Sequence, residues 1–263
     1  MSGRISATRR SSVGWARLTC GGSAEGETVN LGAFAALARA TAVEKQALAS
    51  GLESRHRWRM STETPRLASA SGGLPSAVGW AHLLLADRLR PGAFVVDATA
   101  GNGHDTLFLA HLVGPTGHVL AFDVQAEALA ATQARLEAAG IEPGRCTLVH
   151  AGHETLAEHL LVDWRGRVDA GVFNLGYLPG GDKTRITQAE TTLAALAVAV
   201  DHLSPGGLLT VAVYPGHEGG REEQRAVAAW AESLPARAFE VQLLRPINRA
   251  ATPPECWAVL KKG

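Results

Sequence analysis

The segment with the clearest chemical potential is a glycine-containing loop within Val-Val-Asp-Ala-Thr-Ala-Gly-Asn-Gly-His-Asp-Thr, residues 95–106. It joins a short apolar run to a segment with helical spacing. Gly101 and Gly103 let the backbone come close to a ligand at the start of that helix, where free N–H groups point outward. The pattern therefore predicts a ligand-binding loop at the N-terminus of the first crossover helix.

Two carboxylates indicate which ligand this loop would bind. A dinucleotide loop prefers Gly-x-Gly-x-x-Gly, but Thr106 occupies the third glycine position. Asp97 precedes the loop and suits the ammonium group of S-adenosylmethionine better than a pyrophosphate, which it would repel. Asp123 ends the next apolar run, where a carboxylate can accept both ribose hydroxyls. Each feature is common alone, so the combination is what predicts this nucleoside cofactor.

A second loop, residues 172–183, carries side chains that could position an amine. The carbonyl oxygens of the Asn174 side chain and the Leu175 main chain could accept two N–H bonds, directing the amine lone pair at a methyl donor. Tyr177 could stack on a base. The order Asn-x-x-Tyr is similar to the Asn-Pro-Pro-Tyr loop of amino-group methyltransferases. The alternative is a glycine-rich turn whose asparagine caps a helix.

His217, within Tyr214-Pro-Gly-His-Glu-Gly-Gly220, is a candidate general base. A primary alkyl amine is protonated near pH 7 and must lose a proton before or during its attack on a methyl group. His217 could instead orient the substrate, cap the helix that begins near Arg221, or have no role.

His150 and His153 follow the third predicted strand, where the adenine of such a cofactor would lie. Their spacing falls in a loop without a Cys or His partner pair, so we expect no metal site. Near the C-terminus, Pro253-Pro254 could form a pocket wall or a plain hairpin connection. Arg245 and Arg249 lie beside it and could contact phosphate.

The elements that must position these loops alternate between strands and helices. Periodicity predicts helices over 74–89, 104–113, 126–139, 187–203 and 221–233, and strands over 94–96, 118–122, 146–149, 170–173, 208–213, 239–244 and 257–261. Pro205-Gly206-Gly207 is expected to close the fourth of these helices. The alternation predicts an α/β, Rossmann-like methyltransferase fold, with a mostly parallel seven-stranded sheet flanked by helices.

Composition limits the class of protein. Apolar residues make up 46% of the 263-residue chain and charged residues 19%, as in globular proteins. No apolar run approaches the roughly 18 residues of a membrane span. The three cysteines, Cys20, Cys146 and Cys256, are far apart, which indicates reduced thiols in a cytoplasm rather than a disulfide framework.

Residues 1–59 differ from the rest, with 9 Lys and Arg against 4 Asp and Glu, whereas residues 60–263 have 16 against 21. We expect a methyltransferase domain over 60–263 and an N-terminal extension over 1–59, disordered or partly helical over 31–52. A transit peptide has a similar composition, and a start codon misassigned ahead of Met60 is another alternative. The acidic body argues against broad nucleic-acid binding but allows a local basic patch.

Together these blocks resemble a family of class I methyltransferases first labelled as putative ribosomal-RNA methylases, whose characterised bacterial members methylate 5-aminomethyl-2-thiouridine at the tRNA wobble position. The resemblance runs from about residue 74 to 261. It rests on residues 97–106, residues 173–183, Gly216-His217 with Gly219-Gly220, and Asn248 followed by Pro253-Pro254. It implies methyl transfer from S-adenosylmethionine to the aminomethyl nitrogen.

The resemblance also implies roles for particular residues. Asn174, Tyr177 and His217 would face the substrate amine. By position, the resemblance also implies that Asp97, Gly101, Asn102, Gly103 and Asp123 line the cofactor. We further expect these residues to contact the cofactor: Thr99, Asp105, Thr106, Gln125, His153 and Asn174. A tRNA partner is expected, with no membrane and no metal, and a homodimer is one of the oligomeric states that the sequence allows. Nothing transfers to residues 1–59.

Three alternatives remain open. The first is an N-methyltransferase for rRNA or a small-molecule amine. The second is a nucleotide- or RNA-binding module without catalysis, which would need no amine-orienting loop. The third is an NAD-dependent dehydrogenase, against which Thr106 and the lack of hydride-transfer residues argue.

Overall fold

The computed structural model describes residues 15–16, 29–30, 73–160, 164–176, 186–216, 218–249 and 252–263. The chain divides into two units, residues 1–61 and 62–263. In the first, strands β1 (Trp15–Ala16) and β2 (Val29–Asn30) pair antiparallel. The helix predicted over 31–52 lies outside the described residues. The boundary between residues 59 and 60, and the disorder of the extension, therefore stay predictions.

The second unit is built on a seven-stranded sheet of order β5-β4-β3-β6-β7-β9-β8. Five strands run parallel: β3 (Phe94–Asp97), β4 (His118–Asp123), β5 (Cys146–His150), β6 (Val168–Asn174) and β7 (Leu203–Val213). Strand β9 (Glu255–Lys261) pairs antiparallel with β7 and with β8 (Phe239–Leu244). The predicted Rossmann-like fold is confirmed. The strand order reverses at β3, and a crevice at such a switch point is where ligands bind in these folds.

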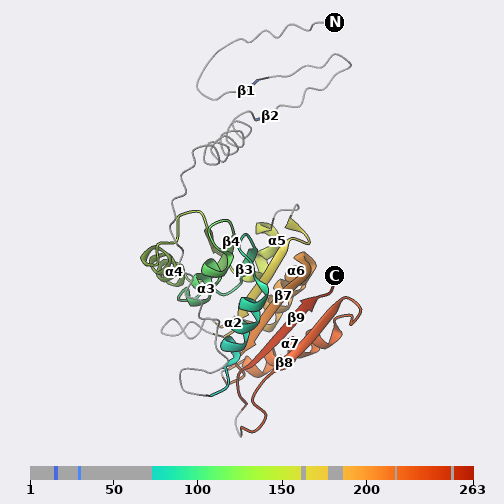
Figure 1. Cartoon of the computed structure of the whole chain (residues 1–263). Helices are drawn as coiled ribbons and strands as arrows, with labels where there is room; N and C mark the ends of the chain where they lie inside the picture. The colour runs from blue at the N-terminus through green and yellow to red at the C-terminus, as the bar shows by residue number, and fades with distance from the viewer. Residues whose placement is uncertain are drawn as a thin grey trace, which may run out of the picture. The chain divides into compact units, whose positions relative to one another are not determined.

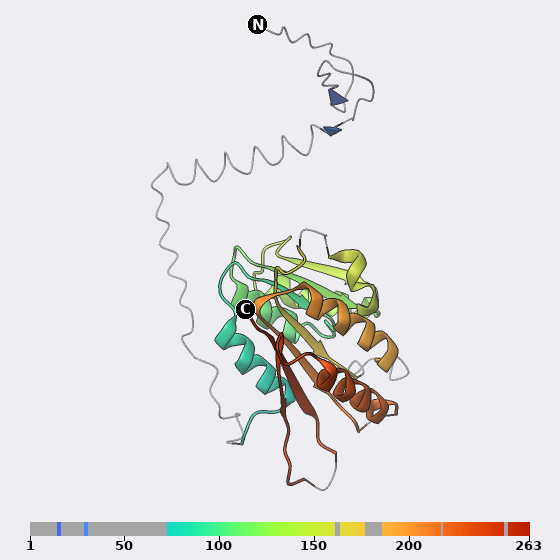
Figure 2. The ribbon, with the colours of Figure 1, turned by 90° about the vertical axis from the view of Figure 1, so that its right-hand side faces the viewer.

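Helices cover both faces of the sheet (Figures 1 and 2). One layer holds α2 (Ala77–Arg88), α3 (His104–Val113) and α4 (Ala126–Ala138); the other holds α5 (Leu156–His159), α6 (Ala189–His202) and α7 (Gly220–Ser233). Helix α5 and the preceding 3-10 turn η1 (His153–Thr155) are too short for periodicity to predict. None of the described helices is long and apolar enough to cross a membrane.

The core consists of two apolar layers separated by the sheet. Successive residues of a strand point to opposite faces, so Val95 packs with the α2, α3 and α4 layer and Val96 with the other. In β4, Val119 and Leu120 are divided in the same way. Both faces are buried, which explains why these strands appear in the sequence as uninterrupted apolar runs.

Several element boundaries differ from those predicted. Helix α2 begins at Ala77, after Ser76 caps it by accepting a hydrogen bond from the Gly79 amide at 3.1 Å. The segment Pro205–Gly207, expected to separate helix from strand, lies within β7. There the pairing with β6 jumps from Leu203 to Leu208. Because proline has no N–H to donate, the irregular register accommodates it inside the strand.

The two-layer core predicts different costs for truncating two leucines. Leu109 in α3 is fully buried, whereas Leu243 in β8 is 38% exposed. We expect Leu109→Ala to lower the free energy of unfolding by about 2–5 kcal/mol. The matched control Leu243→Ala should change it by less than about 0.5 kcal/mol. Urea unfolding followed by tryptophan fluorescence measures both, and equal losses would contradict the assigned core.

Candidate active site

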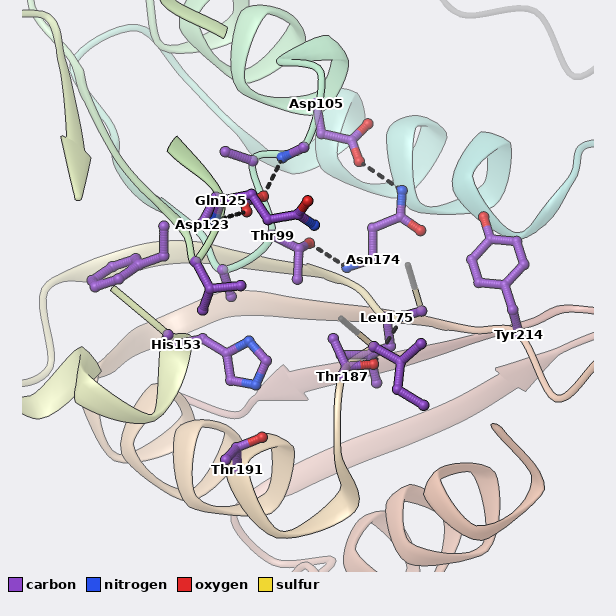
Figure 3. A pocket seen from close by; sticks show the side chains of 18 of the residues that line it. Thr99, Asp105, Asp123, Gln125, His153, Asn174, Leu175, Thr187, Thr191 and Tyr214 are labelled. Atoms are coloured by element: carbon purple, nitrogen blue, oxygen red, sulfur yellow. Dashed lines mark hydrogen bonds between the residues drawn. The ribbon is translucent and has the colours of Figure 1, made fainter. Parts of the chain in front are cut away.

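A cavity of about 850 Å³ lies at the carboxyl ends of the parallel strands. Its walls come from the loops after β3, β4, β5, β6 and β7, from α2, and from the segment before β9. Figure 3 shows the lining side chains pointing into it from both helix layers. The volume is in the range of cavities that hold a small-molecule cofactor.

The cavity brings together most of the predicted site residues. Those that line it are Thr99, Gly101, Asn102, Asp105, Asp123, Gln125, His153 and Asn174. Asp97, Gly103 and Thr106 are not among the lining residues and lie behind the wall. Tyr177 and His217 lie outside the described residues, so their roles stay predictions. Pro254 lines the cavity, which supports the pocket-wall interpretation of the proline pair.

Asp123, at the end of β4, holds the glycine loop in place. Its Oδ2 accepts a hydrogen bond from the Gly101 amide at 2.9 Å, and its Oδ1 accepts one from the Gln125 amide at 2.8 Å. The carboxylate is therefore fixed at the cavity wall. Each of its oxygens can accept a further hydrogen bond, so a ligand hydroxyl can bind there.

Gly103 is required for packing between helices. It caps α3 with φ of 76°, in the left-handed region. A Cβ at this position would lie 2.7 Å from the Cα of Thr132 in α4. The sequence predicted that the backbone at Gly101 and Gly103 would come close to a ligand. Gly101 does line the cavity, whereas Gly103 lies against helix α4.

Asp97 is fully buried and organises the loop from behind. Its Oδ1 accepts a hydrogen bond from the Thr99 amide at 3.1 Å, and its Oδ2 accepts one from the Thr106 hydroxyl at 2.6 Å. Burial, followed by the charge of Asp105, raises the pKa of Asp97 to about 7. A cation in the cavity would lower this pKa, because it favours the charged form.

Asn174, at the end of β6, is held by both its main chain and its side chain (Figure 3). Its amide N–H donates to the Thr99 hydroxyl at 2.7 Å, and its Nδ2 donates to Asp105 Oδ2 at 3.2 Å. A carboxylate only accepts hydrogen bonds, so this contact fixes which way the side-chain amide is turned. The side-chain carbonyl oxygen of Asn174, Oδ1, is consequently the atom that can accept a hydrogen bond from a ligand in the cavity.

His82 on α2 is a site residue that the sequence interpretation missed. Its Nε2 lies 2.7 Å from Asp105 Oδ1, and its ring stacks on Phe108 at 3.9 Å between centroids. Asp105 is therefore held between His82 and Asn174. A histidine within an apolar stretch of the helix was the available clue, but nothing local indicated a partner 23 positions away.

Tyr214 also lines the cavity, at the end of β7. Tyr214 is the first residue of the segment that contains His217, but no local pattern predicted a role for it. Burial raises the pKa of the Tyr214 phenol, so the hydroxyl stays protonated at neutral pH and can donate a hydrogen bond. Figure 3 shows its hydroxyl directed to the side of the cavity that holds Asn174.

A buried glutamate in α7 joins the two ends of the segment that follows Asn174. Glu223 accepts hydrogen bonds from the hydroxyls of Thr187 and Thr192 at 2.8 and 2.7 Å. The Thr187 hydroxyl also accepts from the Gly176 amide at 2.9 Å, and the Thr187 amide donates to the Gly176 carbonyl. These bonds hold Gly176 and Thr187 together at the cavity wall.

His153 lines another wall of the cavity as a buried, neutral ring. The side chain is buried, and burial lowers its pKa, so the ring is neutral. One ring nitrogen bonds to the backbone of Ala98, while Nε2 has no partner among the described residues. His150, in contrast, is exposed and bonds to the Val124 carbonyl. Within the described part of the chain, no group of three His, Cys, Asp or Glu could hold a metal.

The buried Asp97 predicts a pH dependence of stability. Its folded-state pKa lies near 7 and its ordinary value is 3.8, so the folded chain holds more protons than the unfolded chain between these values. Stability should therefore fall, on the order of a few kcal/mol, as pH rises through this window. Urea unfolding from pH 4 to 8 should show a shallower fall for Asp97→Asn. Parallel profiles for both proteins would contradict the assignment.

Comparison with known proteins identifies the family of this chain. A family model described as "Putative rRNA methylase" matches residues 119–260. The chain is 39% identical over 188 residues to the chloroplastic tRNA (mnm(5)s(2)U34)-methyltransferase of Arabidopsis thaliana. The aligned region covers 69% of this chain and 68% of the relative.

Two solved structures share the fold along nearly their whole length. An rRNA-methylase (putative) from Clostridium thermocellum is 38% identical with a TM-score of 0.68, covering 72% of this chain and 99% of that chain. A methyltransferase (putative) from Streptococcus mutans, solved in complex with SAH, is 35% identical with a TM-score of 0.64 and the same coverage. These matches confirm the family that the sequence motifs indicated. The chain belongs to the "Putative rRNA methylase" family.

Proposed function

We propose that this chain transfers a methyl group from S-adenosylmethionine to the aminomethyl nitrogen of 5-aminomethyl-2-thiouridine at the tRNA wobble position. The product would be 5-methylaminomethyl-2-thiouridine. The observation that carries the proposal is the direction of the Asn174 side chain, whose carbonyl oxygen is left for the cavity by the bond to Asp105. The name of the plant relative and the SAH bound to the streptococcal structure support it.

The cavity residues fit this cofactor. Asp123 would accept hydrogen bonds from the ribose hydroxyls, and His153, which lines the cavity, would lie against the adenine. The carboxylates of Asp105 and Asp123 on the wall, with Asp97 behind them, favour a cationic ligand. When bound, S-adenosylmethionine supplies an electrophilic methyl group on a sulfonium.

The chain's own contribution to the reaction would be orientation of the amine. The carbonyl oxygens of the Asn174 side chain and the Leu175 main chain would accept two N–H bonds, so that the nitrogen lone pair points at the methyl group. Asn174 is already fixed by Thr99 and Asp105. No reorganisation of the side chain is then needed when the amine binds.

The amine must also lose a proton, because an alkyl amine is protonated near neutral pH. His217 remains the candidate base by prediction. Asp105 has a different role in the proposal: held at 2.7 Å from His82, it keeps a carboxylate next to Asn174 and would stabilise the incoming ammonium.

The compartment and assembly state are further parts of the proposal. Cys146 and Cys256 are free, and unpaired cysteines fit a reducing compartment such as the cytoplasm. Association into a homodimer stays a prediction, to be measured by sedimentation.

The proposed reaction can be tested directly. Purified chain, labelled S-adenosylmethionine and tRNA carrying 5-aminomethyl-2-thiouridine should give one added methyl on that nucleoside, detected by nucleoside mass spectrometry. Ribosomal RNA and free alkyl amines serve as competing substrates. A methyl gained only by one of these would replace the tRNA assignment, and cofactor binding without any transfer would support a binding module.

The orienting role of Asn174 predicts a loss of turnover without a loss of cofactor. Asn174→Ala should lower kcat about 100-fold, since a misplaced reacting group costs on this order, while the Kd for S-adenosylmethionine measured by calorimetry changes little. Asp105→Asn should also lower kcat, because an amide at position 105 no longer fixes the Asn174 orientation. Gln133→Ala removes an exposed amide on α4 and should have no effect. Full activity of Asn174→Ala would eliminate the amine-orienting role.

A further inference from the structure

We infer that the exposed tip of the β8–β9 hairpin, residues 245–249, binds phosphates of the RNA strand that delivers the nucleotide to the cavity. We call this segment the arginine tip; its sequence is Arg-Pro-Ile-Asn-Arg. The inference rests on the proposed function, because it takes the substrate to be RNA. It assigns the part of the surface that holds the RNA outside the cavity.

The arginine tip lies at the edge of the sheet where the cavity opens. Leu244 of β8 pairs with Cys256 of β9, and the adjacent Glu255 pairs with Val213 at the carboxyl end of β7. The tip therefore begins where the parallel strands end. On the returning limb, Thr252 and Pro254 line the cavity itself. Figures 1 and 2 both show this hairpin extending beyond the rest of the sheet.

The fold does not account for two exposed side chains of the tip, Ile247 and Arg249. Ile247 is 89% exposed, Arg249 is exposed, and neither belongs to the two core layers. The tip contains two arginines and no acidic residue. Among the described residues, no carboxylate forms an ion pair with Arg249. An exposed positive charge beside a cavity mouth fits a phosphate, which is the group most protein contacts to nucleic acids reach.

Arg245 is partly oriented in advance. Its Nη1 lies 3.9 Å from Oε2 of Glu255, a buried carboxylate. Glu255 is fixed in turn, since it accepts hydrogen bonds from Trp257 Nε1 at 2.8 Å and Gln224 Nε2 at 2.9 Å. The arginine side chain remains 49% exposed. A guanidinium has five N–H donors in a rigid plane, so most of them remain for a phosphate.

The charge of the surrounding chain makes the tip distinctive. Residues 60–263 carry 16 Lys and Arg against 21 Asp and Glu, so the body would repel a polyanion on average. A local pair of arginines next to the cavity would give RNA a place to bind on that body. This arrangement would reconcile an acidic methyltransferase with a tRNA substrate.

The test measures RNA affinity and its dependence on salt. Fluorescence anisotropy would give the Kd of the full chain for labelled substrate tRNA at several salt concentrations. Arg245→Ala and Arg249→Ala should each raise the Kd about tenfold. Each should also reduce the slope of log Kd against log salt by about 0.7–0.9, the value for one lost phosphate contact. Arg245→Lys keeps the charge and should retain the wild-type slope.

The same hairpin supplies a matched control. Arg237 is exposed and lies two residues before the start of β8, at the end of the strand opposite the cavity, where Phe239 pairs with Lys261. Arg237→Ala removes the same charge and should leave both the Kd and the slope at wild-type values. Calorimetry with S-adenosylmethionine checks that every variant keeps its folded cofactor site.

The outcomes separate this inference from the function on which it rests. If wild-type chain binds and methylates the tRNA and the tip variants bind it equally well, the inference is overturned and the proposed function stands. Weaker binding with an unchanged salt slope would also overturn it, because the lost contact would not be to phosphate. If wild-type chain neither binds nor methylates the tRNA, the proposed function itself has failed.

Discussion

The hydrogen bond from Asn174 Nδ2 to Asp105 Oδ2 joins the loop that would hold the cofactor to the loop that would hold the substrate. Asp105 lies at the start of α3 and Asn174 at the end of β6, so the bond exists only because β3 and β6 are neighbours in the sheet. His82 fixes the carboxylate from α2. The orientation of one amide thus depends on the packing of both helices against adjacent parallel strands.

The charged side chains of the site complement the charges of the two proposed ligands, the cofactor and the RNA. Three aspartates, Asp97, Asp105 and Asp123, surround the glycine loop, and a sulfonium cofactor with an ammonium group complements them. Burial keeps Asp97 partly protonated until such a cation arrives. The arginine tip adds the opposite charge at the mouth. The cationic cofactor would bind inside the cavity beside the aspartates, and the RNA polyanion would bind at its edge to the arginine tip.

The order of elements and the position of both loops could be predicted from the sequence, because apolar runs and helical spacing are local properties. Helix α3 was predicted with its observed bounds, His104–Val113. The start of β7 was missed because Pro205-Gly206-Gly207 was expected to close the preceding helix, whereas a register shift with β6 accommodates Pro205 inside the strand. The contact between His82 and Asp105 could not be predicted, because it depends on how α2 packs.

In the proposed reaction, the side-chain carbonyl oxygen of Asn174 accepts a hydrogen bond from the substrate amine, while Asp105 accepts one from the side-chain nitrogen of Asn174. The most direct measurement is a crystal structure with SAH and an anticodon stem-loop carrying 5-aminomethyl-2-thiouridine. We expect the aminomethyl nitrogen to lie about 2.9 Å from Asn174 Oδ1, with the hydrogen bond from Asn174 Nδ2 to Asp105 retained. An amine bound elsewhere in the cavity, or an Asn174 amide turned away from Asp105, would contradict it.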